Sequence, residues 1–164
     1  MAALPGGFTR RAAHIAFVYG GQLWRVPAGG GEALPLTSAE FIASNPVWSP
    51  DSQSIAFSAN RHGNADVFIM PAKGGEIRRL TTHSQADTPQ AFTPDGKSVF
   101  FSSMRLGDSK VAFGGILSGS SIQLYSIPVT GGRERLIIPT PALDTKPSSD
   151  GRFILYTSLN APEN

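Results

Sequence analysis

The chain contains no cysteine among its 164 residues. This absence excludes disulfide bonds, zinc–thiolate sites and thiol nucleophiles. The sequence also lacks any uninterrupted apolar run of about eighteen residues, so we expect no transmembrane helix. Charged residues make up only 16% of the chain, against roughly 25% in average globular domains. We therefore expect that much of the chain lies between packed sheets rather than on a solvated face.

Basic residues are scattered along the chain, and the formal net charge is only +2. Nucleic-acid-binding proteins concentrate such charge on one stripe, so we expect no nucleic-acid partner. The compartment stays open, because large periplasmic domains can also lack cysteine. Residues 1–11 do not have the basic-then-apolar order of a signal peptide. We expect a periplasmic protein if a signal has been removed, and otherwise a cytoplasmic one.

Histidine occurs only three times, at His14, His62 and His83. A nucleophile needs a base within hydrogen-bond reach and a third group that orients the base. No histidine is accompanied locally by a serine and a paired acid, and the Gly-x-Ser-x-Gly elbow is absent. The dispersed histidines and aspartates do not form a clustered set of metal ligands either. We expect no catalytic residue, no metal and no cofactor in this chain.

The sequence is built from internal repeats. A Pro-x-x-Gly-Gly turn follows an apolar run three times, and an aspartate-containing turn precedes a second apolar run three times. Pro27 and Pro71 are 44 residues apart, and so are Pro50 and Pro94. The glycine turns are residues 27–31, 71–75 and 128–132, and the aspartate turns contain Pro50-Asp51, Pro94-Asp95 and Ser149-Asp150.

This period, with four strand-like segments per copy, is typical of the β-propeller, whose blades are four-stranded antiparallel sheets of about 40 to 45 residues. We predict an all-β fold, a partial β-propeller of about three to four such blades. The alternative is a flat sandwich of seven or more short strands, but sandwich strands do not repeat as a unit of four. The predicted copies are residues 14–37, 45–81, 88–138 and 145–158, between an N-terminal extension of residues 1–13 and a C-terminal tail of residues 159–164.

The first copy is predicted to begin at its second strand, near His14, and the last to end after its second strand, near Ser158. The resulting thirteen strands make little more than three blades. Closed propellers need about four to eight blades, and an open ring exposes apolar faces and strand edges that recruit another chain. We therefore expect the chain to self-associate.

Three further features are expected within the copies. In the aspartate turns, the proline presets φ, the aspartate side chain accepts hydrogen bonds from following backbone amides, and the glycine tolerates a positive φ. Ser52 stands where the other turns have that glycine, so we expect a less demanding turn type there. Trp24 and Trp48 are expected to pack between blades. The third copy carries extra residues within 104–121. These residues are either a loop on a binding face or a surface insertion.

The second copy, residues 45–81, resembles a known repeat in its Asn-Pro-Val-Trp-Ser-Pro-Asp, Ile-Ala-Phe-Ser, Arg-His-Gly-Asn-Ala-Asp-Val-Phe-Ile-Met, Gly-Gly and Arg-Leu-Thr segments. It is similar to the propeller repeat of TolB and of the N-terminal domain of tricorn-type serine peptidases, and the similarity is closer to the latter. The resemblance implies a noncatalytic propeller that gates or guides peptides, with the catalytic domain absent from this chain. Residues 146–150 depart from the pattern, because they lack the aromatic residue of the other copies.

The candidate contact residues lie at the blade loops and at the entry to the first strand of each copy. Arg61 and Asp66 bracket a loop, where they either close the hairpin as a bidentate ion pair or place Arg61 on a rim as a peptide or partner contact. The segments that enter the first strands would converge on the channel of a radial array of blades. They supply the remaining candidates, Asn45, Asp87, Thr88, Asp144, Thr145 and Lys146.

Two functions therefore remain open. The first is a substrate-gating or peptide-binding propeller that resembles the tricorn-like domain, with a peptide or protein partner and a peptidase domain in the parent chain. The second is a free-standing, TolB-like scaffold for protein interaction. A reading frame that continues beyond Asn164 into a peptidase domain would distinguish them.

Overall fold

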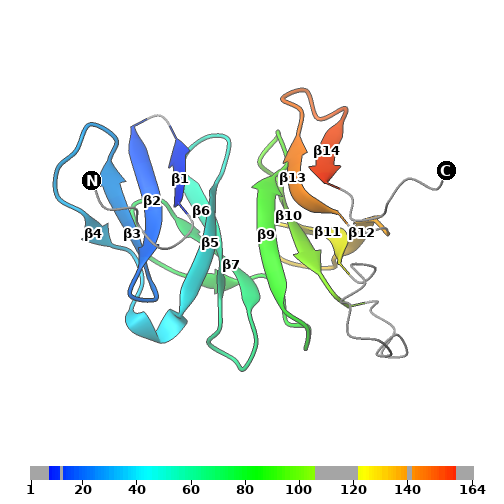
Figure 1. Cartoon of the computed structure of the whole chain (residues 1–164), viewed down its shortest axis with the longest axis horizontal. Coiled ribbons are helices and arrows are strands. Elements are labelled where there is room, and N and C mark those ends of the chain that lie inside the picture. The colour runs from blue at the N-terminus through cyan, green and yellow to red at the C-terminus, as the bar shows by residue number, and fades with distance from the viewer. Residues whose placement is uncertain (1–7, 12, 106–121, 140–141, 158–164) are drawn as a thin grey trace.

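The computed structural model describes residues 8–11, 13–105, 122–139 and 142–157. The regular secondary structure of this part consists of β-strands and one short 3-10 helix, η1 (Ala39–Phe41). No helix in these residues is long and apolar enough to cross a membrane. The strands form three four-stranded antiparallel sheets and one two-stranded sheet, each in sequence order (Figure 1).

Each sheet corresponds to one copy of the repeat, and we call the sheets blades 1 to 3 and the half-blade. Blade 1 contains β1 (Phe8–Arg11), β2 (His14–Tyr19), β3 (Gln22–Pro27) and β4 (Leu34–Pro35). Blade 2 contains β5 (Ala43–Trp48), β6 (Ser54–Ala59), β7 (Asp66–Pro71) and β8 (Arg78–Arg79). Blade 3 contains β9 (Asp87–Phe92), β10 (Ser98–Ser103), β11 (Gln123–Pro128) and β12 (Arg135–Ile138), and the half-blade contains β13 (Leu143–Pro147) and β14 (Ile154–Thr157).

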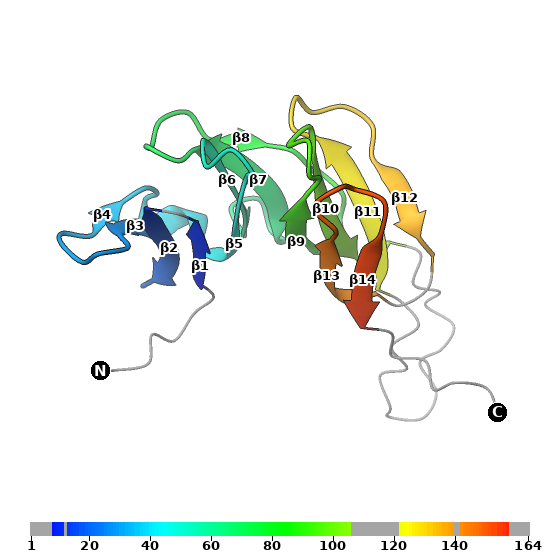
Figure 2. The same cartoon turned by 90° about the horizontal axis from the view of Figure 1, so that it is seen from above.

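The blades follow one another along an arc (Figure 2). The first strand of each sheet lies on the inside of the arc, and β1 lies against β5, β5 against β9 and β9 against β13. The fourth strands lie on the outside. This radial order of strands is the architecture of a partial β-propeller, as the repeat predicts.

Apolar residues from facing sheets make the core between neighbouring blades. Between blades 1 and 2, Phe57 stacks on Phe68 and both meet the edge of Phe41 in η1. Between blades 2 and 3, Phe101 stacks on Tyr125. Since both faces of blade 2 are buried, its central strands carry continuous apolar runs rather than alternating ones.

One prediction about the strands is wrong. Residues 8–11 form β1, which pairs with residues 14–17 of β2, so the first blade has its first strand and the described residues contain fourteen strands. Residues 1–13 are therefore not an extension throughout. This strand could not be recognised from the sequence, because it is short and is joined to β2 without the aspartate turn that marks the other copies.

A second correction concerns Ser52. This serine has a φ of 63°, like Gly96 at 71° and Gly151 at 72° in the same position of the other copies. The turn is therefore the same in all three copies, although only glycine adopts this conformation without strain. The expected aspartate contact is confirmed, because the amide of Gln53 donates to Oδ1 of Asp51 over 2.9 Å.

Candidate functional site

The sequence-predicted contact residues fall into two groups. Asp66 and Asp87 begin a strand and are completely buried, whereas Asn45, Asp144 and Lys146 lie on inner strands and are exposed. These two environments permit different chemistry.

Asp66 is held by Arg79 of the same blade. Nη2 of Arg79 lies 2.6 Å from Oδ2 of Asp66, and its Nε donates to the carbonyl of Thr81. Burial raises the pKa of Asp66 although Arg79 opposes this shift. Because β8 pairs with β7 beside Asp66, the partner comes from the outer strand.

The predicted Arg61–Asp66 pair is therefore wrong. The guanidinium of Arg61 lies 4.7 Å from the centre of the Phe41 ring, in a cation–π contact across the junction of blades 1 and 2. Arg61 is exposed, so of the two interpretations the rim position is the one seen. The sequence suggested only Arg61, which lies five residues before Asp66, whereas the pairing of β7 with β8 brings Arg79 to this carboxylate.

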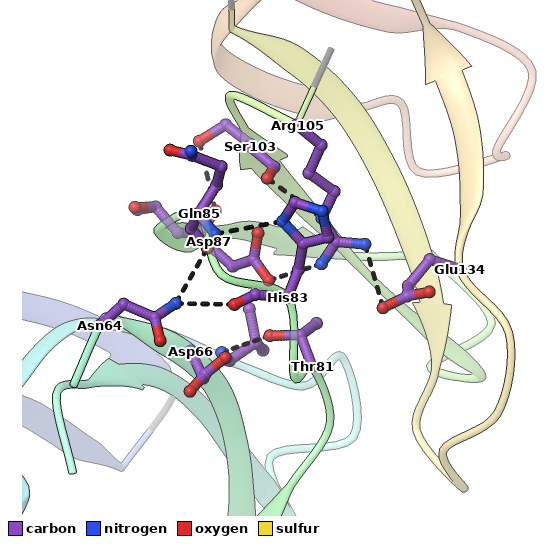
Figure 3. A network of polar contacts seen from close by, with 12 residues as sticks. Asn64, Asp66, Thr81, His83, Gln85, Asp87, Ser103, Arg105 and Glu134 are labelled. Atoms are coloured by element: carbon purple, nitrogen blue, oxygen red, sulfur yellow. Dashed lines mark hydrogen bonds and ion pairs between the residues drawn. The ribbon is translucent and has the colours of Figure 1, made fainter. Parts of the chain in front are cut away.

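Asp87 is held by Arg105, which the sequence analysis did not single out (Figure 3). Nη2 of Arg105 lies 2.6 Å from Oδ2 of Asp87, and Nη1 lies 3.0 Å from Oε1 of Glu134. Burial lowers the pKa of Arg105, but Asp87 and Glu134 outweigh it and raise the pKa above its usual value. Arg105 also lies over the rings of Phe101 and Tyr125. Arg105 lies at the start of the segment that holds the extra residues of the third copy, 104–121, so the repeat did not reveal this role. Residues 106–121 lie outside the described part of the chain.

Asn64 ties the loop between β6 and β7 to the segment that enters blade 3 (Figure 3). Its Nδ2 donates to the carbonyls of His83 and Gln85, over 2.8 and 3.0 Å. Nδ1 of His83 accepts a hydrogen bond from the amide of Gln85. This polar network joins blades 2 and 3, and the ion pairs of the buried Asp66 and Asp87 lie beside it (Figure 3).

The inner strands present a different surface. Asn45 and Asp144 have φ angles of 48° and 49°, and each lies in an irregularity of strand pairing, in β5 and β13 respectively. Both side chains are exposed. Lys146 is also exposed, but Thr145 is only 2% exposed and Thr88 is partly buried. The strands that carry these segments lie side by side on the inside of the arc (Figure 2), and Asn45, Asp144 and Lys146 are exposed on them.

A pocket of about 470 Å³ lies at the other end of the inner strands, near the aspartate turns. Trp48, Phe92 and Pro147 contribute to its wall, and these residues end β5, β9 and β13. Trp48 also packs, partly buried, against the core between blades 1 and 2, as expected. The sequence signal for the pocket was the aromatic residue two positions before the turn proline in two copies.

The structure defines no metal centre in the residues it describes, where no group of three or more histidine, aspartate or glutamate side chains could hold an ion. His62 stacks on Phe68, with ring centres 6.3 Å apart. His83 belongs to the polar network. Both contacts place histidine side chains in structural roles.

Comparison with known proteins identifies the family. Residues 9–164 match the family model of the tricorn protease N-terminal β-propeller domain, whereas no curated protein matches the chain. A putative TolB from Agrobacterium tumefaciens is 21% identical with a TM-score of 0.73, over 92% of this chain and 52% of the other. TolB from Acinetobacter baumannii is 22% identical with a TM-score of 0.71, over 93% and 36%.

The tricorn protease is 22% identical with a TM-score of 0.69, over 88% of this chain and 14% of the other. The chain thus spans about half or less of the length of these proteins, and at such identities the similarity shows the fold alone. The family match extends over nearly the whole sequence. The chain therefore belongs to the family of tricorn protease N-terminal β-propeller domains.

Proposed function

We propose that this chain is a noncatalytic propeller module that binds an extended peptide along its inner strands, as part of a tricorn-like peptidase. The observation that carries the proposal is the family match over residues 9–164, since the matched domain is the N-terminal propeller of a protease. Under this proposal the chain guides peptides, and a separate peptidase domain cleaves them.

The inner strands supply a surface suited to such a ligand. Each of β1, β5, β9 and β13 is the end strand of its sheet, so one backbone edge faces the inside of the arc without a strand partner in its own sheet. An extended peptide can add to such an edge by backbone hydrogen bonds. The irregularities at Asn45 and Asp144 interrupt this edge, which limits indiscriminate strand addition and exposes polar side chains.

The pocket beside Trp48, Phe92 and Pro147 supports the same proposal. Apolar and aromatic walls bind a side chain, and a few polar groups fix its orientation. A peptide lying along the inner strands would place apolar side chains in this pocket and contact Asn45 and Asp144 with its polar groups.

Fluorescence anisotropy with labelled, unstructured peptides of about ten to fifteen residues tests the proposal. We expect saturable binding that weakens several-fold in Asp144→Asn, a variant that keeps a residue tolerant of positive φ. Glu76→Gln is the matched control, because it removes the same charge from an exposed position beyond the outer glycine turn of blade 2. Binding that is equal in Asp144→Asn and Glu76→Gln would contradict the proposed surface.

The free-standing scaffold predicts a different result in this assay. If the chain is a scaffold for folded partners, unstructured peptides should not bind at any accessible concentration while the chain remains folded by circular dichroism. That outcome would refute the peptide-binding proposal. The similarity to TolB does not favour either function, because it concerns the fold alone.

A further inference from the structure

A second pocket, of about 200 Å³, lies at the junction of blades 1 and 2, and we call it the junction pocket. Blade 1 contributes His14 of β2 and Arg25 of β3. Blade 2 contributes Trp48 of β5 and the turn residues Gln53 and Lys73. Both sides of the pocket therefore belong to four-stranded sheets within the described part of the chain.

Three basic side chains line the junction pocket, and its described lining includes no acidic one. His14 and Arg25 are partly buried, and Lys73 is exposed. Nη1 of Arg25 donates to the carbonyl of Ala72 over 3.0 Å, and this bond holds the guanidinium against blade 2. The pocket thus has a positively charged lining with one cation in a fixed place.

Arg25 differs from the other partly buried arginines among the described side chains. Arg79 is paired with Asp66, and Arg105 is paired with Asp87, whereas no described carboxylate is paired with Arg25. A charged group that has lost part of its hydration is stabilised when an opposite charge and hydrogen bonds replace the water. The position of Arg25 therefore favours an anionic ligand.

The repeat does not require the three charges of the junction pocket. Strand register and turn position give the equivalent residues of the other blades, and all of them are uncharged: Ser54 and Ser98 for His14, Ile69 and Ser126 for Arg25, and Gly29 and Thr130 for Lys73. Those blades have the same order of strands. The charges are thus not needed to form a blade, which favours a role in binding.

We propose that the junction pocket binds a small organic carboxylate with a short apolar body. Nε and Nη2 of Arg25 form a planar fork that can hold a carboxylate through two parallel hydrogen bonds, and Lys73 adds a second positive charge. The indole of Trp48 and the methyl groups of Ala13 and Ala72 suit the apolar body.

The volume of the junction pocket limits the size of the ligand. Pockets for drug-sized molecules have about 300 to 1,000 Å³, so about 200 Å³ suits a ligand of only a few heavy atoms. The site is distinct from the peptide surface proposed above, although Trp48 contributes to the wall of both pockets. The inference therefore stands independently of peptide binding.

Titration with butyrate, followed by tryptophan fluorescence, tests the proposal. Trp24→Phe leaves Trp48 as the single tryptophan of the chain and serves as the parent. We expect a saturable change in emission with butyrate at constant ionic strength, and none with butyramide, which has nearly the same shape without the charge. Equal responses to the two compounds, or no saturable response to butyrate up to about 50 mM, would overturn the proposal.

Inorganic phosphate tests the apolar part of the ligand. It carries negative charge without an apolar body, so we expect it to bind several-fold more weakly than butyrate. Phosphate that binds as tightly as butyrate, or more tightly, would refute the assignment to an organic carboxylate.

Arg25→Gln in the same parent should weaken butyrate binding by about tenfold or more, because it removes charge-assisted hydrogen bonds. Arg78→Gln is the matched control. Arg78 donates to the carbonyl of Val129, which is the blade 3 equivalent of Ala72, and it lies outside the junction pocket. Equal weakening in the two variants would show a general effect of charge and would contradict the site.

Lys73→Glu decides the matter if Arg25→Gln does not fold, since Lys73 is exposed and its replacement leaves the core intact. This variant should bind butyrate several-fold more weakly than Lys97→Glu, which makes the same change of charge at an exposed position of blade 3. Equal affinities for butyrate in these two variants would refute the junction pocket as the binding site.

Discussion

Single residues in the aspartate turns show how closely the copies agree. In each of the three aspartate turns, the hydroxyl before the turn accepts a hydrogen bond from the amide that follows the turn and donates one to the aspartate. The hydroxyls belong to Ser49, Thr93 and Ser148, and the amides to Ser54, Ser98 and Phe153. These contacts hold the pKa values of Asp51, Asp95 and Asp150 below their usual value. The turn is thus a structural unit, which explains why its aspartates recur.

Ser52→Gly should stabilise the protein. The serine holds a φ of 63°, which costs an L-residue about 1 to 2 kcal/mol, and the greater freedom of glycine in the unfolded chain offsets part of the gain. We expect a net increase of about 0.5 to 1 kcal/mol in the free energy of unfolding, measured by urea denaturation. Gly96→Ser, at the equivalent position, should shift stability the other way, and equal signs for the two variants would contradict this explanation.

Asp66 and Asp95 should give opposite pH dependences. Burial raises the folded-state pKa of Asp66, so this carboxyl contributes most below about 3.8 and its contribution falls as pH rises through the folded pKa. The hydroxyl of Thr93 lowers the pKa of Asp95, whose contribution is present above about 3.8 and is lost as pH falls through the folded pKa.

The measurement compares each asparagine variant with the wild type between about pH 2.5 and 7. The advantage of the wild type over Asp66→Asn should shrink as pH rises, whereas its advantage over Asp95→Asn should shrink as pH falls. Parallel slopes for the two variants would show that burial does not control the carboxyl of Asp66.

At the scale of elements, the junction between blades carries most of the packing. Phe57 is completely buried and Trp48 is only partly buried, although both belong to the junction of blades 1 and 2. Phe57→Ala should therefore destabilise by about 3 to 5 kcal/mol, as for other buried aromatic residues. Trp48→Ala should cost clearly less, because part of its indole faces the pocket. Chemical denaturation of both variants checks this order, and an equal loss would place the Trp48 ring in the core.

The four-stranded sheet also explains which arginine pairs with which acid. Arg79 reaches Asp66 because β8 lies beside β7, and Arg105 reaches Asp87 because β10 ends beside the start of β9. Arg79 thus lies in the neighbouring strand of the same sheet, and Arg105 lies two residues beyond the end of the neighbouring strand. Pairing across the loop, as sequence proximity suggested for Arg61, would leave Asp66 without the cation that its burial requires.

At the scale of the whole molecule, the chain should have no hydrolytic activity of its own. The family match is to the N-terminal propeller of a protease, and the described contacts of His62 and His83 are structural. Incubation of the purified chain with unstructured peptides and ester substrates should release no product. Turnover that copurifies with the chain and is lost in His62→Ala or His83→Ala would contradict this expectation.

The sequence by itself determined the blade and its order of strands. The spacing of the glycine and aspartate turns depends on local φ preferences and on side-chain hydrogen bonds within a few residues. Local chemistry of this kind can be recognised without a structure. The propeller fold and the placement of residues 45, 88 and 144 on inner strands could therefore be predicted from the repeat. The resemblance carried by residues 45–81 then pointed to the correct family.

Tertiary structure decided the features that depend on contacts between distant residues. The choice of Arg79 over Arg61 and the bridge from Arg105 to Glu134 join residues whose proximity arises only from the pairing of strands in the sheet. The same is true of exposure. Ile15 of β2 and Ile55 of β6 hold equivalent positions in their blades, but among the described residues only Ile55 packs against a preceding blade and is fully buried. The residue type decides which kinds of contact a side chain can make, and the folded sheet decides which residues lie close enough to make them.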